Sequence, residues 1–203
     1  MKLLLTGFEP FGESPVNPSE QVVRMLAGRE IEGVELHTTI LPVDQERGPA
    51  ALLAALDEVR PGAVLCLGEA RSRAALSVER VAINLLDYRI ADNAGNRIVD
   101  QPIVQDGPAA YFTTLPVRTI CEAIQQAGIP AELSLSAGAF LCNQVTYVLL
   151  HHLVSQQIHI PAGFIHLPAL PEQAARHSQA IPSMSLETAS AGIDAAIRAI
   201  ARS

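Results

Sequence analysis

The sequence predicts a single-domain α/β/α sandwich with a largely parallel, twisted central sheet. Short apolar runs alternate with amphipathic segments of helical length along the 203 residues. This alternation is typical of parallel sheets, in which a helix connects one strand to the next. No linker, repeat or low-complexity tract interrupts the pattern, and a chain of this length can bury a sizeable core. We therefore expect residues 1–203 to form one domain.

The first half of the chain begins with a strand over Lys2–Thr6, followed by a turn rich in Gly, Pro and Asn that reaches Pro18. Ser19 is a good N-cap for a helix over Glu20–Ala27, and Gly28 ends it. Further extended segments are expected over Val34–Leu41, Ala63–Leu67 and Leu76–Leu86, with a helix over Pro49–Val59.

The second half opens with a polar, turn-forming segment, Asp87–Pro102. Helices are then expected over Leu115–Ala127, Leu141–Gln156 and Leu186–Ala201, and strands over Ala131–Ser134 and Ala162–Ile165. In open sheets of this class, sites gather at the carboxyl ends of the strands. Chemically reactive residues at those ends are therefore the candidates for a site.

Composition excludes several kinds of partner. The formal net charge is -7 and the pI is near 5.3, whereas nucleic acids and anionic membranes attract basic surfaces. No apolar run is long enough for a membrane span or a signal-peptide core. The hydrophobic fraction is 49% and the charged fraction 17%, which is lean for a soluble surface and predicts burial of apolar surface in a homo-oligomer.

Three cysteines, Cys66, Cys121 and Cys142, are an odd number with wide, irregular spacing. They fit neither a disulfide framework nor a metal site, and they favour a reducing cytoplasm. Cys66 lies inside an expected strand and Cys121 inside an expected helix, so both are interpreted as core residues.

Cys142 follows a strand and opens a helix, and two interpretations are open. It is either a small core residue in a tight turn or a nucleophile. A helix N-terminus favours an anion. Thiols in such positions can have a pKa of roughly 3.5–7.5 instead of about 8.5, especially beside a protonated imidazole.

A thiol nucleophile needs a base, and His166 is the best placed of the six histidines. It follows the apolar run Gly163–Ile165 and therefore lies at the same edge of the sheet as Cys142. His151 and His152 are about 14 Å along the helix from Cys142. His159 belongs to the opposite edge of the sheet, and His37 lies within a strand. His177, in a polar stretch after Pro171, is not excluded as the base by this argument.

A third group that orients the imidazole would be acidic. Five acidic residues lie near strand ends, and the pattern does not choose among them: Glu9, Glu69, Glu79, Asp87 and Asp92.

Five blocks of the sequence resemble pyroglutamyl peptidase type I, also called pyrrolidone-carboxylate peptidase. They are Thr6–Gly12 with Val16–Pro18, Glu79–Asn84, Gly107–Pro116, Ser136–Asn143, and Gly163–Pro168 with Leu170–Gln173. They occur in order from residue 3 to about residue 173. The resemblance implies a cytoplasmic cysteine exopeptidase, with no cofactor or metal, that removes N-terminal pyroglutamate from peptides through a thioester. It also implies a homotetramer and one catalytic domain over residues 1–203.

Carried over residue by residue, the resemblance makes Cys142 the nucleophile, His166 the base and Glu79 the group that orients it. Arg89 and the backbone N–H of Cys142 would stabilise the oxyanion. Glu69 stands where many relatives carry Gln. The residues implied in substrate binding are Phe8, Phe11, Asn17, Glu69, Ile90 and Phe140.

The implied substrate begins with a flat, neutral lactam and has no free amine, so aromatic faces suit it better than carboxylates or a metal. Phe8 and Phe11 fit that role, although they could instead anchor their own loop. The sequence lacks the motifs of two other classes, the serine hydrolases and the nucleotide-binding proteins. Ser134–Gly138 has Ser where a serine-hydrolase elbow needs its first Gly, and no glycine-rich nucleotide loop is present.

Overall fold

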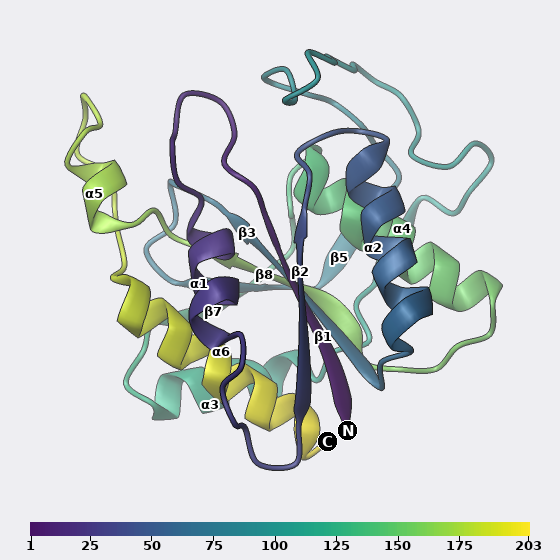
Figure 1. The fold of residues 1–203 in the computed structure, drawn as a ribbon. Helices are drawn as coiled ribbons and strands as arrows, with labels where there is room; N and C mark the ends of the chain where they lie inside the picture. Colours follow the sequence, from purple (N-terminus) through teal and green to yellow (C-terminus); the bar gives the residue numbers. More distant parts are fainter.

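The computed structural model describes residues 1–203 as a six-stranded sheet with helices on both faces, beside a small two-stranded sheet (Figure 1). The strands are β1 (Lys2–Phe8), β2 (Glu35–Leu41), β3 (Ala63–Glu69), β4 (Leu76–Glu79), β5 (Val81–Ile83), β6 (Ala110–Phe112), β7 (Ala131–Ser134) and β8 (Ala162–Leu167). The helices are α1 (Pro18–Leu26), α2 (Arg47–Val59), α3 (Val117–Gln126), α4 (Leu141–Ser155), α5 (Pro171–Ala174) and α6 (Leu186–Ala201).

The strand order of the main sheet is β2-β1-β3-β8-β4-β7. The first four strands are mutually parallel, and β7 is parallel to β4. Only the β4–β8 pair is antiparallel, with Ser77 opposite His166. The prediction of a largely parallel central sheet is therefore confirmed.

Alternate residues of the central strands supply two separate cores. Leu65 and Ile165 face one side, where α1, α3 and α6 pack. Val64, Cys66 and Phe164 face the other side, where α2, α4 and the two-stranded sheet pack. Figure 1 shows these two helical layers on opposite sides of the sheet. This is the α/β/α sandwich expected from strands that are apolar on both faces.

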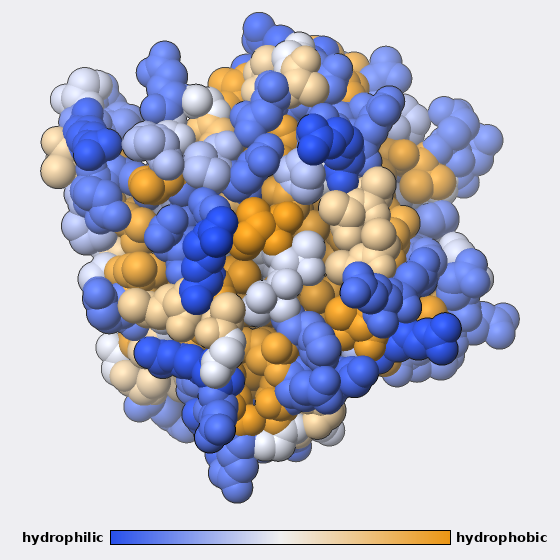
Figure 2. All heavy atoms as spheres, viewed as in Figure 1, coloured by the Kyte–Doolittle hydropathy of each residue, from blue (hydrophilic) through white to orange (hydrophobic).

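The connections at the carboxyl ends of the parallel strands form one end of the molecule. Figure 1 shows the loop after β1, the long segment before β6, and α5 at the top, with both termini at the bottom. Figure 2, in the same view, shows apolar residues among polar side chains on the side of the molecule that faces the viewer. None of the helices has the length and apolar character that crossing a membrane requires.

The start of α1 corrects one expectation. Asn17, not Ser19, is the N-cap, and its side chain accepts a hydrogen bond from the Ser19 backbone N–H at 3.0 Å. The helix begins at Pro18, whose fixed φ suits the first helical position. The Ser19 hydroxyl instead accepts from the Phe8 backbone N–H at 2.9 Å, which joins the helix to the end of β1.

The expected extended segment Leu76–Leu86 is broken at Arg80. The Arg80 backbone N–H donates to Ser134 O, and its carbonyl accepts from the Thr113 N–H, so the chain passes from the main sheet to the small one. Two further elements were not predicted, namely strand β6 and the one-turn helix α5. β6 depends on its long-range pairing with β5, and α5 is a single turn with only local backbone bonds, too short to show a helical period.

Candidate active site

The predicted site residues gather around one cavity of about 910 Å³ at the carboxyl ends of β1, β3 and β8. All of them except Glu79 line it: Phe8, Phe11, Asn17, Glu69, Arg89, Ile90, Phe140, Cys142 and His166. Glu79 is buried behind His166, with 1% of its side chain exposed. Residues from four of the five resembling blocks thus meet in space with Glu69, Arg89 and Ile90, although they are spread across most of the sequence.

Cys142 is the second residue of α4, at the helix N-terminus that the sequence predicts. The neighbouring Asn143 anchors this end of the helix, because its side chain exchanges hydrogen bonds with the backbone of Ile83 and donates to Leu85 O. The N-cap residue, Phe140, offers no side-chain acceptor. The first-turn N–H groups of α4 are therefore free of a side-chain cap, as an anion-binding helix N-terminus requires.

Gly68 makes room for the sulfur. A Cβ built on Gly68 would lie 2.8 Å from Cys142 Sγ and 2.6 Å from Phe164 Cζ. Gly68 is also the partner of His166 in the β3–β8 register. Adjacent strands lie about 4.8 Å apart, so Sγ rests over β3 directly beside the His166 position. Sequence reasoning did not single out Gly68, because its importance depends on what packs above it.

His166 lies near the end of β8, as expected, and the strand runs to Leu167, two residues beyond the expected Ile165. Its Nδ1 is 2.7 Å from Glu79 Oε1, which orients the imidazole. Glu79 Oε1 also accepts from Arg73 Nη1 at 2.7 Å, and the same guanidinium donates through Nη2 to Ser136 O at 2.7 Å. No hydrogen bond joins Cys142 Sγ to His166 in this structure. Arg73 was not predicted from the sequence, where it reads as part of a polar turn.

The His166–Glu79 pair combines a charged acid with a neutral base. Burial by itself would raise the pKa of Glu79, but His166, the Ser134 hydroxyl and Arg73 together hold that pKa below its usual value. Burial lowers the pKa of His166, and the Arg73 charge lowers it further against the opposing effect of Glu79. At neutral pH this arrangement favours an uncharged imidazole hydrogen-bonded to a carboxylate.

The expectation that its position lowers the pKa of Cys142 is wrong. Burial, followed by the negative charges of Glu79 and Glu69, raises the pKa of this thiol to about 12, and its own backbone N–H opposes the change only partly. Burial raises the pKa of Cys66 to about 12 as well. The location of Cys142, on the cavity wall and beside His166, is what separates it from a core thiol.

Aromatic rings form one side of the cavity. The ring centroids of Phe11 and Phe140 are 6.1 Å apart, and Tyr88 packs edge-on against Phe140 at 4.6 Å. The guanidinium of Arg71 lies 5.9 Å from the Phe11 centroid. Phe8 is almost fully buried and belongs to the core, so it supports this wall from behind.

Glu69 and Asn17 are polar residues held mainly by the protein itself. Glu69 Oε1 accepts from Arg71 Nε at 2.7 Å and from Gln173 Nε2 at 3.0 Å, while its buried Oε2 has no partner. Burial raises the pKa of Glu69, and its partners offset only part of that effect. The Asn17 amide nitrogen donates to Glu9 O, and its oxygen caps α1.

Arg89 and Ile90 come from the long segment between β5 and β6. Both are exposed, and Arg89 forms no ion pair. The segment is fixed near the cavity by Asn93, whose side chain donates to Glu9 Oε1 and to Pro10 O, each at 2.9 Å. These hydrogen bonds join the segment at Asn93 to the β1–α1 loop that carries Phe11.

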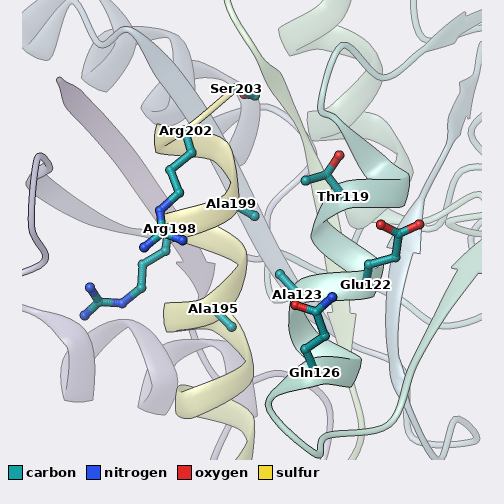
Figure 3. A pocket seen from close by; sticks show the side chains of 9 residues that line it. All are labelled: Thr119, Glu122, Ala123, Gln126, Ala195, Arg198, Ala199, Arg202 and Ser203. Carbon is teal, nitrogen blue, oxygen red and sulfur yellow. The ribbon is translucent and has the colours of Figure 1, made fainter.

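The remaining histidines and hollows do not form a second site. His177 also lines the cavity, but it is exposed and bonds within its own loop to Gln179. A second hollow, of about 550 Å³, lies between α3 and α6 on the opposite face of the sheet and contains no Cys or His (Figure 3). No cluster of three or more potential metal ligands is present.

Comparison with known proteins decides the family. The sequence profile described as "Pyroglutamyl peptidase", a family of cysteine peptidases, matches residues 1–203. The chain belongs to the pyroglutamyl peptidase family. It is 51% identical, over 193 residues, to a pyrrolidone-carboxylate peptidase from Vibrio vulnificus, covering 95% of this chain and 89% of that protein.

Two solved structures support the same assignment. A crystal structure of pyroglutamyl peptidase I from Bacillus amyloliquefaciens matches with a TM-score of 0.96 and 40% identity, covering 100% of this chain and 97% of that one. A mutant pyrrolidone carboxyl peptidase from Pyrococcus furiosus gives the same TM-score and identity, covering 100% and 99%. The predicted fold, family and activity, a cysteine peptidase that removes N-terminal pyroglutamate, are confirmed.

Proposed function

We propose that this member of the pyroglutamyl peptidase family works through Cys142, His166 and Glu79. The observation that carries the proposal is the placement of Cys142 Sγ over Gly68, beside the imidazole that Glu79 orients. The reaction is acyl transfer to sulfur followed by hydrolysis of the thioester.

The protonation states set the order of events. The raised pKa of Cys142 and the lowered pKa of His166 mean that the thiol and the imidazole both start neutral. His166 therefore removes the thiol proton as sulfur attacks the scissile carbonyl, and Glu79 stabilises the imidazolium that forms. The same proton then passes to the leaving amine, and His166 later activates the water that cleaves the thioester.

The negative charge on the tetrahedral intermediate needs donors. The backbone N–H of Cys142 lies in the uncapped first turn of α4, where the helix dipole adds positive potential. Arg89 lines the cavity without a carboxylate partner, so its guanidinium is free to approach the oxyanion.

Recognition of the pyroglutamyl ring rests on the aromatic wall. Phe11 and Phe140, with Phe8 behind them and Ile90 beside them, offer apolar surface to a flat neutral lactam. Asn17 acts by holding the loop that carries Phe11. Glu69, fixed between Arg71 and Gln173, closes the polar side of the cavity near the end of β3.

Hydrolysis of a pyroglutamyl-aminocoumarin, measured beside its prolyl and glutamyl counterparts, tests this function. We expect turnover of the pyroglutamyl compound alone, with kcat/KM reduced by more than about 10⁴-fold in Cys142→Ala. Cys121→Ala, which changes a buried thiol on α3, is the matched control and should retain activity. Undiminished turnover by Cys142→Ala would overturn the assignment of the nucleophile, and equal turnover of all three compounds would overturn the specificity.

We also propose that the chain assembles as a homo-oligomer, with the tetramer as the number that the family resemblance implies. Phe112 on β6 is 74% exposed and Leu135 after β7 is 70% exposed. Backbone hydrogen bonds from Arg80 to Ser134 and from Thr113 to Arg80 bring these two segments together. Apolar side chains this exposed on adjoining segments are typical of a subunit contact.

Sedimentation measurements test the assembly. We expect Phe112→Asp to lower the molecular mass in solution, whereas Val154→Asp, at an exposed position near the end of α4, should leave it unchanged. A wild-type protein that sediments as a monomer at all concentrations would contradict the proposal.

Residues 1–203 are proposed to act as one catalytic domain in the cytoplasm. All site residues come from a single sheet and its loops, which supports one catalytic unit. All three cysteines are free, and the reaction requires one of them in its reduced form. A reducing compartment meets that requirement.

A further inference from the structure

Arg73 connects Glu79, which orients His166, to the loop that leads to Cys142. It lies in the β3–β4 loop, lines the cavity, and has 22% of its side chain exposed. One arm of its guanidinium, Nη1, donates to Glu79 Oε1, and the other arm, Nη2, donates to Ser136 O, both at 2.7 Å. Ser136 stands at the start of the loop that leads into α4 and Cys142.

The orientation of the Glu79 carboxylate depends on few contacts. Its Oε1 receives both His166 Nδ1 and Arg73 Nη1, and the nearby Ser134 hydroxyl also favours the charged form, while its buried Oε2 has no hydrogen-bond partner. A carboxylate held through one oxygen by His166 alone could rotate. A planar guanidinium that is itself fixed at Ser136 restricts that rotation, which a single flexible ammonium would do less well.

We propose that Arg73 is a positioning residue of the reaction, which fastens the Glu79 carboxylate to the Ser136 loop so that His166 is held facing Cys142. The proposal rests on the catalytic roles proposed above. Arg73 would act through Glu79 and through the loop, and it need not touch the substrate.

The charge of Arg73 has a second consequence. The titratable and charged groups around His166 are Glu79 on β4, Arg73 on the β3–β4 loop and Cys142 on α4, while Glu69 at the end of β3 acts on Cys142. Arg73 is the positive charge that opposes protonation of the imidazole. Its removal should therefore raise the pH at which His166 titrates, in addition to loosening the geometry.

Steady-state kinetics on Arg73→Gln and Arg73→Lys test the inference. We expect Arg73→Gln to lower kcat by about 10²-fold with little change in KM, since a misplacement of about 1 Å costs that much. The acid limb of its kcat/KM profile should move to higher pH. Arg73→Lys keeps the charge without the planar fork, so it should restore the position of the acid limb but only part of kcat.

Arg118→Gln, on the exposed side of α3 at the other face of the sheet, is the matched control and should behave as wild type. A kcat for Arg73→Gln within twofold of wild type, with an unchanged acid limb, would overturn the proposal. An acid limb that shifts in Arg73→Lys as far as in Arg73→Gln would also overturn the proposal, because the shift would then not come from loss of charge.

A measurement without substrate separates this inference from the proposed function. The titration of His166, followed by NMR in wild type and in Arg73→Gln, should move to higher pH in the variant. If wild type failed to cleave pyroglutamyl substrates and this shift were still seen, the proposed function would fail while the electrostatic role of Arg73 stood. An unshifted titration in an active wild-type background would remove the role of Arg73 alone.

Discussion

Cys142 and Cys66 pack on the same side of the central sheet and both have strongly raised pKa values, yet only Cys142 meets the cavity. In the proposed mechanism, reactivity at this site therefore depends on proton transfer to His166 during attack rather than on a thiolate already present before substrate binds. The acids that orient His166 and close the cavity, Glu79 and Glu69, are the same charges that disfavour the thiolate.

The protonation state of Cys142 can be tested by alkylation with iodoacetamide across pH 5 to 9. A thiolate–imidazolium pair would give a rate plateau already at pH 5 to 6. Because burial and two carboxylates raise the pKa of this thiol, we expect the rate to rise with pH throughout the range. Mass spectrometry of the labelled peptide assigns the signal to Cys142, and a plateau at acid pH would contradict the neutral resting state.

Gly68 is predicted to be essential for activity. In Gly68→Ala the added methyl group would meet Cys142 Sγ at 2.8 Å and the Phe164 ring at 2.6 Å, so one of them must move. A displacement of the sulfur by about 1 Å should lower kcat/KM by about 10²-fold. The matched control is Gly62→Ala, where the methyl group meets only atoms 3.6 Å or more away. Equal activities of the two variants would show that Sγ tolerates the shift.

The start of α1 joins helix stability to the shape of the cavity. Asn17 caps the helix through its side-chain oxygen and holds Glu9 O through its nitrogen, so one side chain fixes both ends of the loop that carries Phe11. Loss of the Asn17 side chain is therefore expected both to destabilise α1 and to disturb the cavity wall at Phe11.

Asn17→Ala should destabilise the protein by about 1 kcal/mol, the usual cost of losing an N-cap. It should also raise KM, because the Phe11 loop loses its attachment. Ser185→Ala removes the N-cap of α6, which lies away from the cavity, and serves as the control. We expect a similar loss in urea-unfolding free energy for both variants and a change in KM for Asn17→Ala only. A changed KM in both would mean that stability alone explains the effect.

For the whole molecule, much of the architecture follows from the sequence because parallel strands bring their carboxyl ends together. That rule places Cys142 and His166 at one edge, and the structure agrees. It could not select Glu79, since β4 runs antiparallel to β8 and Glu79 reaches His166 diagonally across that pair. The family resemblance selected Glu79 instead.

Other features depend on contacts that no local pattern records. Gly68 and Arg73 acquire meaning only from the side chains that fold over them. The break at Arg80 lies in a run without Gly or Pro, and long-range backbone pairing produces it. The N-cap of α1 could have been predicted from local sequence. Pro18 favours the first helical position, which makes Asn17 the N-cap, whereas the prediction chose Ser19.

The buried titratable residues of the site also make the stability of the whole fold depend on pH. The folded pKa values of His166 and Glu79 both lie below their ordinary values, so the unfolded chain binds more protons as the pH falls. Stability contributed by His166 is therefore present above about pH 6.5 and is lost as the pH falls below it, with Glu79 following below about pH 4.3. Glu69, with a raised pKa, works in the opposite direction and is relieved by protonation.

Urea unfolding at pH 7, 6 and 5 tests this linkage. We expect the free energy of unfolding of the wild type to fall over this range, and His166→Gln to show a smaller fall, because Gln at this buried position cannot take up a proton. His37→Gln, on the half-exposed strand β2, is the matched control and should follow the wild type. If His166→Gln and wild type lose stability in parallel, the imidazole is not buried in its neutral form. General-base removal of the Cys142 proton would then have to give way to a preformed ion pair.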